Sequence, residues 1–118
     1  MTYVNGFVLA VPEGSKQAYI DTAEKFWTLA KEFGALSQIE CWEADVKDGH
    51  TTDFRMATKA QDGEKIVFSW VTWPDRETAK AAEKRMMEDP RMEDFGAMPF
   101  DGKRMIYGGF ETVVYKRA

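Results

Sequence analysis

The chain contains very few of the residues that form disulfides and metal centres. Its 118 residues include one cysteine, Cys41, and one histidine, His50. A single cysteine cannot close an internal disulfide, and one cysteine with one histidine cannot complete a zinc site. A glycine-rich phosphate loop is also missing, because Gly108-Gly109 falls within an expected strand and opens no helix. We therefore expect no metal and no cofactor.

Long apolar runs and an excess of positive charge are missing as well. No segment approaches the roughly eighteen apolar residues of a membrane span, and the amino terminus has no basic stretch followed by an apolar signal region. Twenty acidic against sixteen basic side chains give a net charge of −4, which opposes binding to nucleic acids and to anionic lipid surfaces. The sequence predicts a cytoplasmic protein whose partners include no membrane and no nucleic acid.

Large aromatic side chains, by contrast, are plentiful. The chain has eight Phe, four Trp and four Tyr, and each large ring buries on the order of 150 to 250 Å². The chain length suits one domain without disulfides. We expect residues 1–118 to form a single domain with an aromatic-rich core.

One pattern occurs twice along the chain. An apolar segment ends in proline, a helical segment follows, and Phe-Gly-Ala closes the unit. The first copy runs from Pro12 to Phe33-Gly34-Ala35 and the second from Pro74 to Phe95-Gly96-Ala97, an offset of 62 residues at both ends. Two strand-helix-strand halves of one kind predict an α+β domain, a ferredoxin-like sandwich. Such a fold hosts many functions, so the pattern predicts architecture and no particular reaction.

Two long helices are expected. Apolar residues recur at helical spacing from Lys16 to Glu32, and Gly34 supplies a left-handed stop. The second helix spans Arg76 to Glu88 with Asp75 as its N-cap, and a short helical turn from Arg91 to Phe95 follows it.

Five extended segments are expected, which is one more than the fold needs. They are Tyr3–Val11, Leu36–Val46, Thr52–Ala60, Lys65–Trp73 and Met105–Tyr115. In a ferredoxin-like sheet the first and fourth segments are antiparallel neighbours, so only one strand fits between the first helix and Lys65. Either Thr52–Ala60 forms a protruding hairpin arm with the strand before it, or a bend in one segment restores the direction. The sequence leaves both alternatives open.

The expected central strands are apolar on both faces. In the first strand Phe7, Leu9 and Val11 face one side, and Val4, Val8 and Ala10 face the other. Two helices can cover only one face of a sheet, so the second face is expected to be an interaction surface. A two-fold pair of sheets is the commonest solution, and the sequence therefore predicts a homodimer through the sheet face.

Several segments carry a resemblance to a known family. They are Cys41-Trp42-Glu43, Thr52-Asp53-Phe54-Arg55-Met56, Asp89-Pro90-Arg91-Met92 and, above all, residues 98 to 110, Met-Pro-Phe-Asp-Gly-Lys-Arg-Met-Ile-Tyr-Gly-Gly-Phe. Together they resemble the YbaA-like family of short bacterial proteins of unknown function. From Trp73 to Phe95 the chain is also similar to the dimeric α+β barrel superfamily, which includes small antibiotic-biosynthesis-type monooxygenases. The resemblance implies a ferredoxin-like fold and a dimer, and it brings no established catalytic residues.

Asp53 and Arg55 are the first candidates for chemistry. They lie two apart on an expected strand, so their side chains point to the same face. A carboxylate and a guanidinium so placed can hold and polarise a ligand, with the arginine gripping an oxyanion. The competing interpretation is a solvated strand face.

Trp42, Trp70 and Arg104 are the candidate ligand-binding residues. The two tryptophans can wall an apolar cavity between helices and sheet, where enzymes of the resembled superfamily tend to bind substrate, and core packing is the competing interpretation. Arg104 lies where a loop enters the last strand, so it can reach a cavity mouth or form an ion pair with Asp101.

The superfamily resemblance also suggests a reaction. Some of its members oxygenate electron-rich aromatic substrates without metal or flavin, so that the protein only binds, orients and deprotonates. In such a scheme Asp53 would be the base, and Tyr107 or Arg55 the partner of the oxyanion.

Three classes of function follow from these observations. The first is a dimer that binds a small organic ligand and acts as a cofactor-independent monooxygenase or isomerase. The second is a non-enzymatic ligand-sensing or stress-associated accessory protein, and the third is a protein-interaction module. A cavity with a perturbed carboxylate favours the enzyme, whereas a filled interior argues against both ligand-binding hypotheses.

Overall fold

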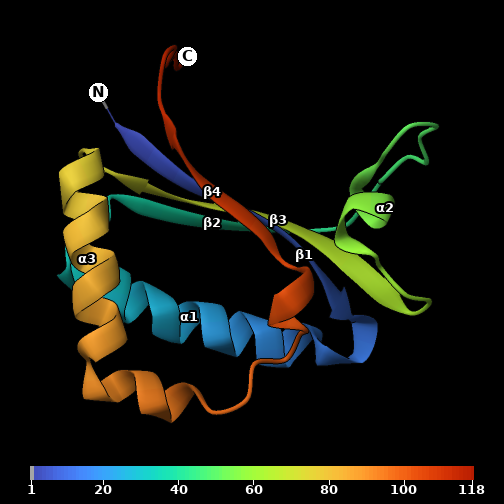
Figure 1. Ribbon diagram of the computed structural model, residues 1–118, viewed down its shortest axis with the longest axis horizontal. Coiled ribbons are helices and arrows are strands. Elements are labelled where there is room, and N and C mark those ends of the chain that lie inside the picture. Colours follow the sequence, from blue (N-terminus) through green and yellow to red (C-terminus); the bar gives the residue numbers. More distant parts are fainter. Residues whose placement is uncertain (1) are drawn as a thin grey trace.

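A computed structural model describes residues 2–118 as a four-stranded antiparallel sheet with the two long helices on one face (Figure 1). The strands are β1 (Tyr3–Pro12), β2 (Ser37–Trp42), β3 (Glu64–Trp73) and β4 (Ile106–Glu111). The α-helices are α1 (Lys16–Glu32), α2 (Phe54–Thr58) and α3 (Arg76–Glu88), and the short 3₁₀ turns are η1 (Glu13–Ser15), η2 (Pro90–Phe95) and η3 (Gly102–Arg104).

The order of the strands is β2-β3-β1-β4, and every neighbouring pair is antiparallel. This order, with one helix after β1 and one after β3, confirms the ferredoxin-like sandwich expected from the repeated unit. The two central strands come one from each half of the repeat. Each half is therefore interleaved with the other.

The two long helices begin and end as predicted. α1 spans Lys16–Glu32, and Gly34 follows it with φ +111°, the left-handed conformation that stops a helix. α3 begins after Asp75, whose side chain accepts a hydrogen bond from the backbone N–H of Thr78 at 2.7 Å. Local signals were sufficient for both elements because periodicity and caps lie within the helix itself.

The segment from Thr52 to Ala60 contains the short helix α2 and not the expected strand. Asp53 accepts the backbone N–H of Met56 at 2.6 Å, which makes it the N-cap of α2, and Lys59 ends the helix with φ 53°. The Asp53 carboxylate favours the helix because it binds a backbone N–H that would otherwise be available to a strand partner. This local bond outweighs the strand propensity of the neighbouring residues. Neither the hairpin arm nor the bend is needed, since α2 leaves only one strand between α1 and β3.

Two expected strands are shorter than predicted. β2 ends at Trp42 and β4 ends at Glu111, whereas extended structure was expected to Val46 and Tyr115. Beyond Glu111 the chain runs past the first residue of β1, and after Trp42 the backbone N–H of Ile66 donates to the Glu43 side chain at 2.8 Å in place of a ladder bond. Propensity alone does not keep such residues in a sheet.

The core lies between the helices and one face of the sheet. Its most deeply buried side chains come from the central strands and from α1, and they include Leu9, Val11, Val67, Val71 and Leu29. The helix-facing positions alternate along each strand, so the opposite positions point to a face that neither α1 nor α3 covers (Figure 1).

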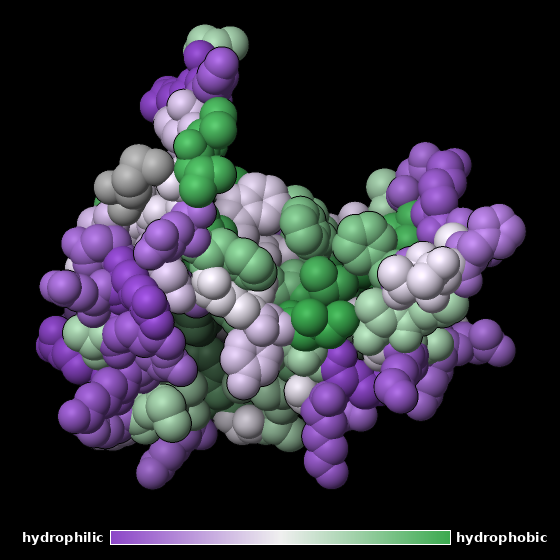
Figure 2. Space-filling view, turned by 45° about the horizontal axis from the view of Figure 1, so that its top comes forward, coloured by the Kyte–Doolittle hydropathy of each residue, from purple (hydrophilic) through white to green (hydrophobic). Residues whose placement is uncertain are grey.

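That opposite face is apolar and exposed. We call it the open face, and it comprises the outward residues of the four strands together with two side chains of α2. Its large exposed members are Ile39, Phe68, Ile106 and Phe110 from the sheet and Phe54 and Met56 from α2. Figure 2 shows hydrophobic side chains gathered around the centre of the molecule in this view. No helix within residues 2–118 is long and apolar enough to cross a membrane.

Candidate functional site

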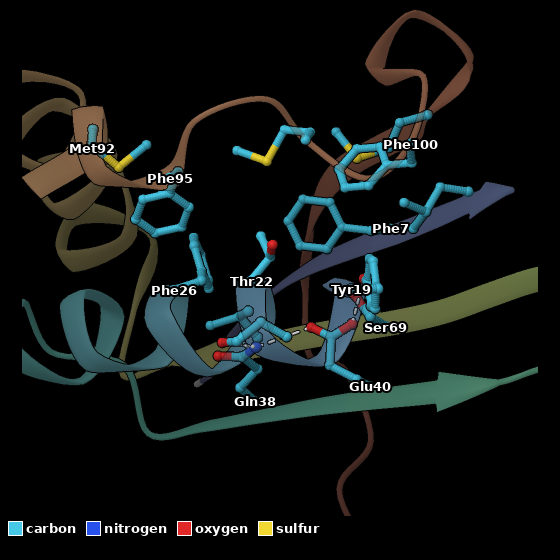
Figure 3. Close-up of a pocket in the computed structure, with 15 residues that line it drawn as sticks. Phe7, Tyr19, Thr22, Phe26, Gln38, Glu40, Ser69, Met92, Phe95 and Phe100 are labelled. Carbon is cyan, nitrogen blue, oxygen red and sulfur yellow. Dashed lines mark hydrogen bonds between the residues drawn. The ribbon is translucent and has the colours of Figure 1, made fainter. Parts of the chain in front are cut away.

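A cavity of about 220 Å³ lies between α1, the helix-facing side of the sheet and the segment from η2 to the start of β4. We call it the near cavity. Figure 3 shows its walls, which consist mainly of aromatic rings and methionines. They include Phe7, Phe26, Phe95, Phe100, Met98 and Met105. Because these side chains offer no charge, the chemistry of the near cavity depends on the few polar groups at its floor.

The polar floor is built by three side chains from α1 and β2 (Figure 3). The hydroxyl of Tyr19 donates to Oε1 of Glu40 at 2.6 Å, and Nε2 of Gln38 donates to Oε2 of Glu40 at 3.0 Å. Gln38 and Glu40 lie two apart on β2, so they share the face that α1 covers. Glu40 also remains solvent-exposed at the sheet edge. The carboxylate is therefore held by two donors and is still accessible.

Gln38 leaves one acceptor without a partner. Its Nε2 donates both to Glu40 and to the backbone carbonyl of Ala23, at 3.1 Å. These two bonds fix the amide orientation and direct Oε1 away from Glu40. Among residues 2–118, Oε1 is the one buried side-chain polar atom with no hydrogen-bond partner. A buried acceptor of this kind costs free energy until a donor reaches it.

Tyr19 is held in its neutral form. Burial raises the pKa of Tyr19 far above its ordinary value, and the hydrogen bond to Glu40 and the charge of that carboxylate raise it further. A hydrogen bond with Ser69 acts in the opposite direction and is the smaller effect. Tyr19 is consequently a hydrogen-bond donor in this site, and Glu40 is the group able to accept a proton.

Asp53 and Arg55 do not form the expected pair on a strand. Asp53 caps α2, where it accepts backbone N–H groups of Met56 and Gly49, and these bonds lower the pKa of its carboxyl group. Arg55 binds both carboxylate oxygens of Glu43, at 2.8 and 2.9 Å. The expectation of a shared strand face was wrong because the segment is helical, and a carboxyl with a lowered pKa is a weak base.

Trp42 and Trp70 do not wall one cavity. Trp42 lies on the helix-facing side of β2 against the cluster around Leu9, with the Lys16 ammonium 5.4 Å from its ring. Trp70 lies on the open face, with its ring 5.5 Å from that of Phe68. Their positions on neighbouring strands have opposite parity in the register, which puts them on opposite faces.

Arg104 and Tyr107 lie outside the near cavity as well. Arg104 binds both carboxylate oxygens of Glu64 at 2.8 Å and also Asp101 at 3.1 Å. The ion-pair interpretation of Arg104 is thus confirmed, with Glu64 as an additional and more buried partner. Tyr107 is exposed and stacks on Phe7 at 6.5 Å between ring centroids. None of the six predicted residues lines the near cavity.

The sequence analysis missed Tyr19, Gln38 and Glu40 as a site. The sequence did contain a signal for this site. Gln38 and Glu40 lie two apart on a strand, so both point to the face that a helix must cover. Tyr19 is one of the residues that recur at helical spacing between Lys16 and Glu32, and its hydroxyl needs a partner once buried. Residues 2–118 contain no group of three or more His, Cys, Asp and Glu side chains that could hold a metal ion.

Comparisons with known proteins agree with this fold. Residues 2–102 match the family described as "Protein of unknown function (DUF1428)". The chain is 58% identical over 115 residues to "Uncharacterized protein YbaA" of Escherichia coli strain K12, covering 97% of this chain and 98% of that protein, and the same values hold for YbaA of Shigella flexneri.

A solved structure is similar in fold. It is a variant of SnoaB, a cofactor-independent oxygenase from Streptomyces nogalater, with a TM-score of 0.50 and 17% identity over 97% of this chain and 93% of that chain. At this level of identity the likeness concerns the fold alone. The match to residues 2–102 and the identity to YbaA show that the chain belongs to the DUF1428 family, the YbaA-like family that its sequence resembles.

Proposed function

We propose that the protein binds a small neutral organic molecule with a hydroxyl or N–H group in the near cavity, and that Glu40 accepts a proton from it. One observation carries this proposal. A single carboxylate at the floor of an apolar cavity is fixed by Tyr19 and Gln38, and it still has access to water.

The size of the near cavity supports a ligand of about one ring. Drug-sized ligands occupy pockets of roughly 300 to 1,000 Å³, whereas the near cavity measures about 220 Å³. An apolar cavity of about 150 Å³ is sufficient for benzene. The aromatic and methionine walls suit the faces and edges of such a ring.

The polar floor supports a ligand that donates hydrogen bonds. Glu40 offers carboxylate oxygens, and Oε1 of Gln38 is buried without a donor. A phenol, an enol or an amide N–H can satisfy one of these acceptors, whereas an anionic ligand would lie against the Glu40 charge. The site therefore favours neutral donors over carboxylates and phosphates.

Proton removal is the chemistry that this arrangement can perform. The proton of a bound O–H or of an acidic C–H passes to the Glu40 carboxylate, and the electron pair stays on the ligand as an enolate or phenolate. The Tyr19 hydroxyl can then turn its hydrogen bond toward the new anion. Isomerisation and oxygenation without a cofactor share this first step, and oxygenation is the activity named for SnoaB.

Ligand titration and a turnover screen test the proposal. We expect phenol and 4-methylphenol to bind the wild-type protein in a calorimetric titration, and Glu40→Gln to weaken binding about 10- to 100-fold, since a hydrogen bond to a charged group is lost. The screen uses quinols, phenols and small lactones in air, and Glu40→Gln should lose any turnover found. Glu13→Gln removes the same charge from an exposed position and should change neither result.

Two outcomes separate the alternatives. Binding without turnover of any compound would favour the non-enzymatic ligand-sensing function. Equal affinity and turnover in wild type and Glu40→Gln, with loss in Asp53→Asn, would reject the Glu40 site and restore the hypothesis drawn from the sequence. Asparagine is a good N-cap, so Asp53→Asn is expected to keep α2 folded.

The second part of the proposal is that a second copy of the chain covers the open face. Where β1 pairs with both β3 and β4, none of the strand residues that point to the open face is charged. They include Val4, Gly6, Val8, Ile39, Cys41, Phe68, Trp70, Thr72, Ile106, Gly108 and Phe110. Such a flat uncharged surface matches its own copy better than a charged partner. The end of the chain adds apolar area, because Val113, Val114 and Tyr115 are exposed where the chain runs past the sheet (Figure 1).

Light scattering after size-exclusion chromatography tests the homodimer. We expect the mass of two chains for wild type and of one chain for Phe68→Glu, since the new carboxylate would be buried unpaired at the centre of the interface. Met87→Glu is the control, because Met87 is 75% exposed on α3. A wild-type monomer, or a Phe68→Glu protein that stays dimeric, would contradict this interface.

A further inference from the structure

A second hollow lies next to the near cavity. We call it the far cavity. It measures about 380 Å³ and lies between α3 and the strands β1 and β4. Figure 2 shows a hollow with an apolar floor beside the hydrophilic side chains at the left of the view, where α3 lies. Its inner wall includes Trp73, Ala79 and Met86.

Four side chains belong to both cavities. Phe7, Phe26, Met92 and Met105 line the near cavity and the far cavity alike. The two linings have no other residue in common. These four side chains therefore form a partition, a wall that separates the two cavities. Two of the four are methionines, whose unbranched side chains change rotamer at little cost. A partition made in part of methionine can open for a ligand that fills both sides.

The far cavity differs from the near cavity in polarity. Its rim carries Lys80 and Glu83 of α3 and the exposed Tyr107, whereas its floor is apolar. The carbonyl oxygen of the Asn5 amide is already engaged, since it accepts the indole N–H of Trp73 at 2.8 Å. The far cavity is therefore apolar inside and polar only at its rim, and it lacks a polar floor like that of the near cavity.

We propose that the two cavities form one elongated ligand site, gated by Met92 and Met105. The hydrogen-bonding head of the ligand lies at Glu40, and an apolar tail crosses the partition into the far cavity. This inference rests on the proposed function, because it needs the head to bind at Glu40. It names the ligand class as a neutral ring that carries an apolar chain, such as a 4-alkylphenol.

Chain length provides the test. The probes are phenol, 4-propylphenol, 4-pentylphenol and 4-heptylphenol, titrated into protein with ¹³C-labelled methionine methyl groups. We expect phenol to shift the methyl signal of Met98, which lines only the near cavity, and 4-heptylphenol to shift Met86 as well, which lines only the far cavity. Affinity should rise roughly fourfold for each methylene that is buried.

A variant separates this site from general apolar binding. Ala79→Leu enlarges a side chain that lines the far cavity and does not line the near cavity. We expect it to bind phenol within about twofold of wild type and to lose the gain in affinity with chain length, together with the Met86 shift. A gain that persists in Ala79→Leu would overturn the inference.

The remaining outcomes also decide the question. If phenol shifts Met98 but 4-heptylphenol neither binds more tightly nor shifts Met86, the elongated site is rejected and the proposed function stands. If no phenol binds or shifts any methionine signal, both are rejected.

Discussion

Replacing Glu64 with glutamine should lower the free energy of unfolding by about 3 kcal/mol. The carboxylate is buried, and it accepts two hydrogen bonds from Arg104 at 2.8 Å and one from the backbone N–H of Gln61 at 2.6 Å. Glutamine has one acceptor oxygen, so its amide N–H groups would face donors, and the Arg104 charge would lose its closest partner. Urea denaturation at pH 7 measures the change.

The same carboxylate predicts a pH dependence. Arg104 lowers the pKa of Glu64 from 4.5 to about 2, although burial acts in the opposite direction. A pKa that is lower in the folded state gives stability above the unfolded pKa, and this stability is lost as the pH falls from about 4.5 to about 2. A difference of this size corresponds to about 3 kcal/mol. The gap between wild type and Glu64→Gln should be constant from pH 7 to 5 and shrink below pH 4.5.

Asp101→Asn is the matched control for Glu64. Asp101 also binds Arg104, at 3.1 Å, but its side chain is 47% exposed. Exposed ion pairs contribute little to stability, so this variant should unfold close to the wild-type denaturant concentration. Equal effects of Glu64→Gln and Asp101→Asn would show that burial of the pair is not what matters.

Replacing Gly109 with alanine should destabilise the fold by about 2 to 3 kcal/mol. A Cβ atom at this position would collide with the hydroxyl and ring of Tyr3, whose side chain belongs to the buried core. Extra volume in a packed core forces side chains out of their rotamers, at a cost of about 1 to 3 kcal/mol. Thermal and urea unfolding measure the effect.

The neighbouring glycine is the control for Gly109. A Cβ atom on Gly108 would lie 3.5 Å from the ring of Phe110, which is an ordinary contact. Gly108→Ala should therefore leave stability within about 0.5 kcal/mol of wild type, since alanine also restricts the unfolded chain. Adding Gly109→Ala to a Tyr3→Leu protein should cost much less than it does in wild type. A full cost there would show that Tyr3 is not the obstacle.

Local signals in the sequence predicted most of the fold. The cap at Asp75 and the glycine stop at Gly34 lie within a few residues of the helices that they bound, so they are readable without tertiary contacts. The prediction for the segment around Asp53 was wrong because α2 has only five residues, too few to show the helical period of apolar residues. The predicted strands extended too far because β4 passes the start of β1 at Glu111, and because the Glu43 side chain replaces a ladder bond just after Trp42.

The candidate site was much less predictable than the fold. Tyr19 and Glu40 are 21 residues apart, and their contact exists only after α1 has packed on β2. We predicted binding roles for Arg55 and Arg104 because an accessible guanidinium can bind an anionic group of a ligand. In the folded chain the Arg55 guanidinium binds the carboxylate of Glu43, and the Arg104 guanidinium binds that of Glu64. Sequence identifies chemical groups, and only packing decides which of them remain available.

The interleaved strand order has a consequence for how the chain is made. β1 and β2 belong to the first half of the repeat, yet they are not neighbours, and β1 pairs only with β3 and β4. The first sheet pair therefore cannot form until residues up to Trp73 have been synthesised and have left the ribosome. Until then α1 has no sheet on which to pack, and pairing over such a separation is slow. In this strand order neither half of the chain can complete its part of the sheet without strands from the other half.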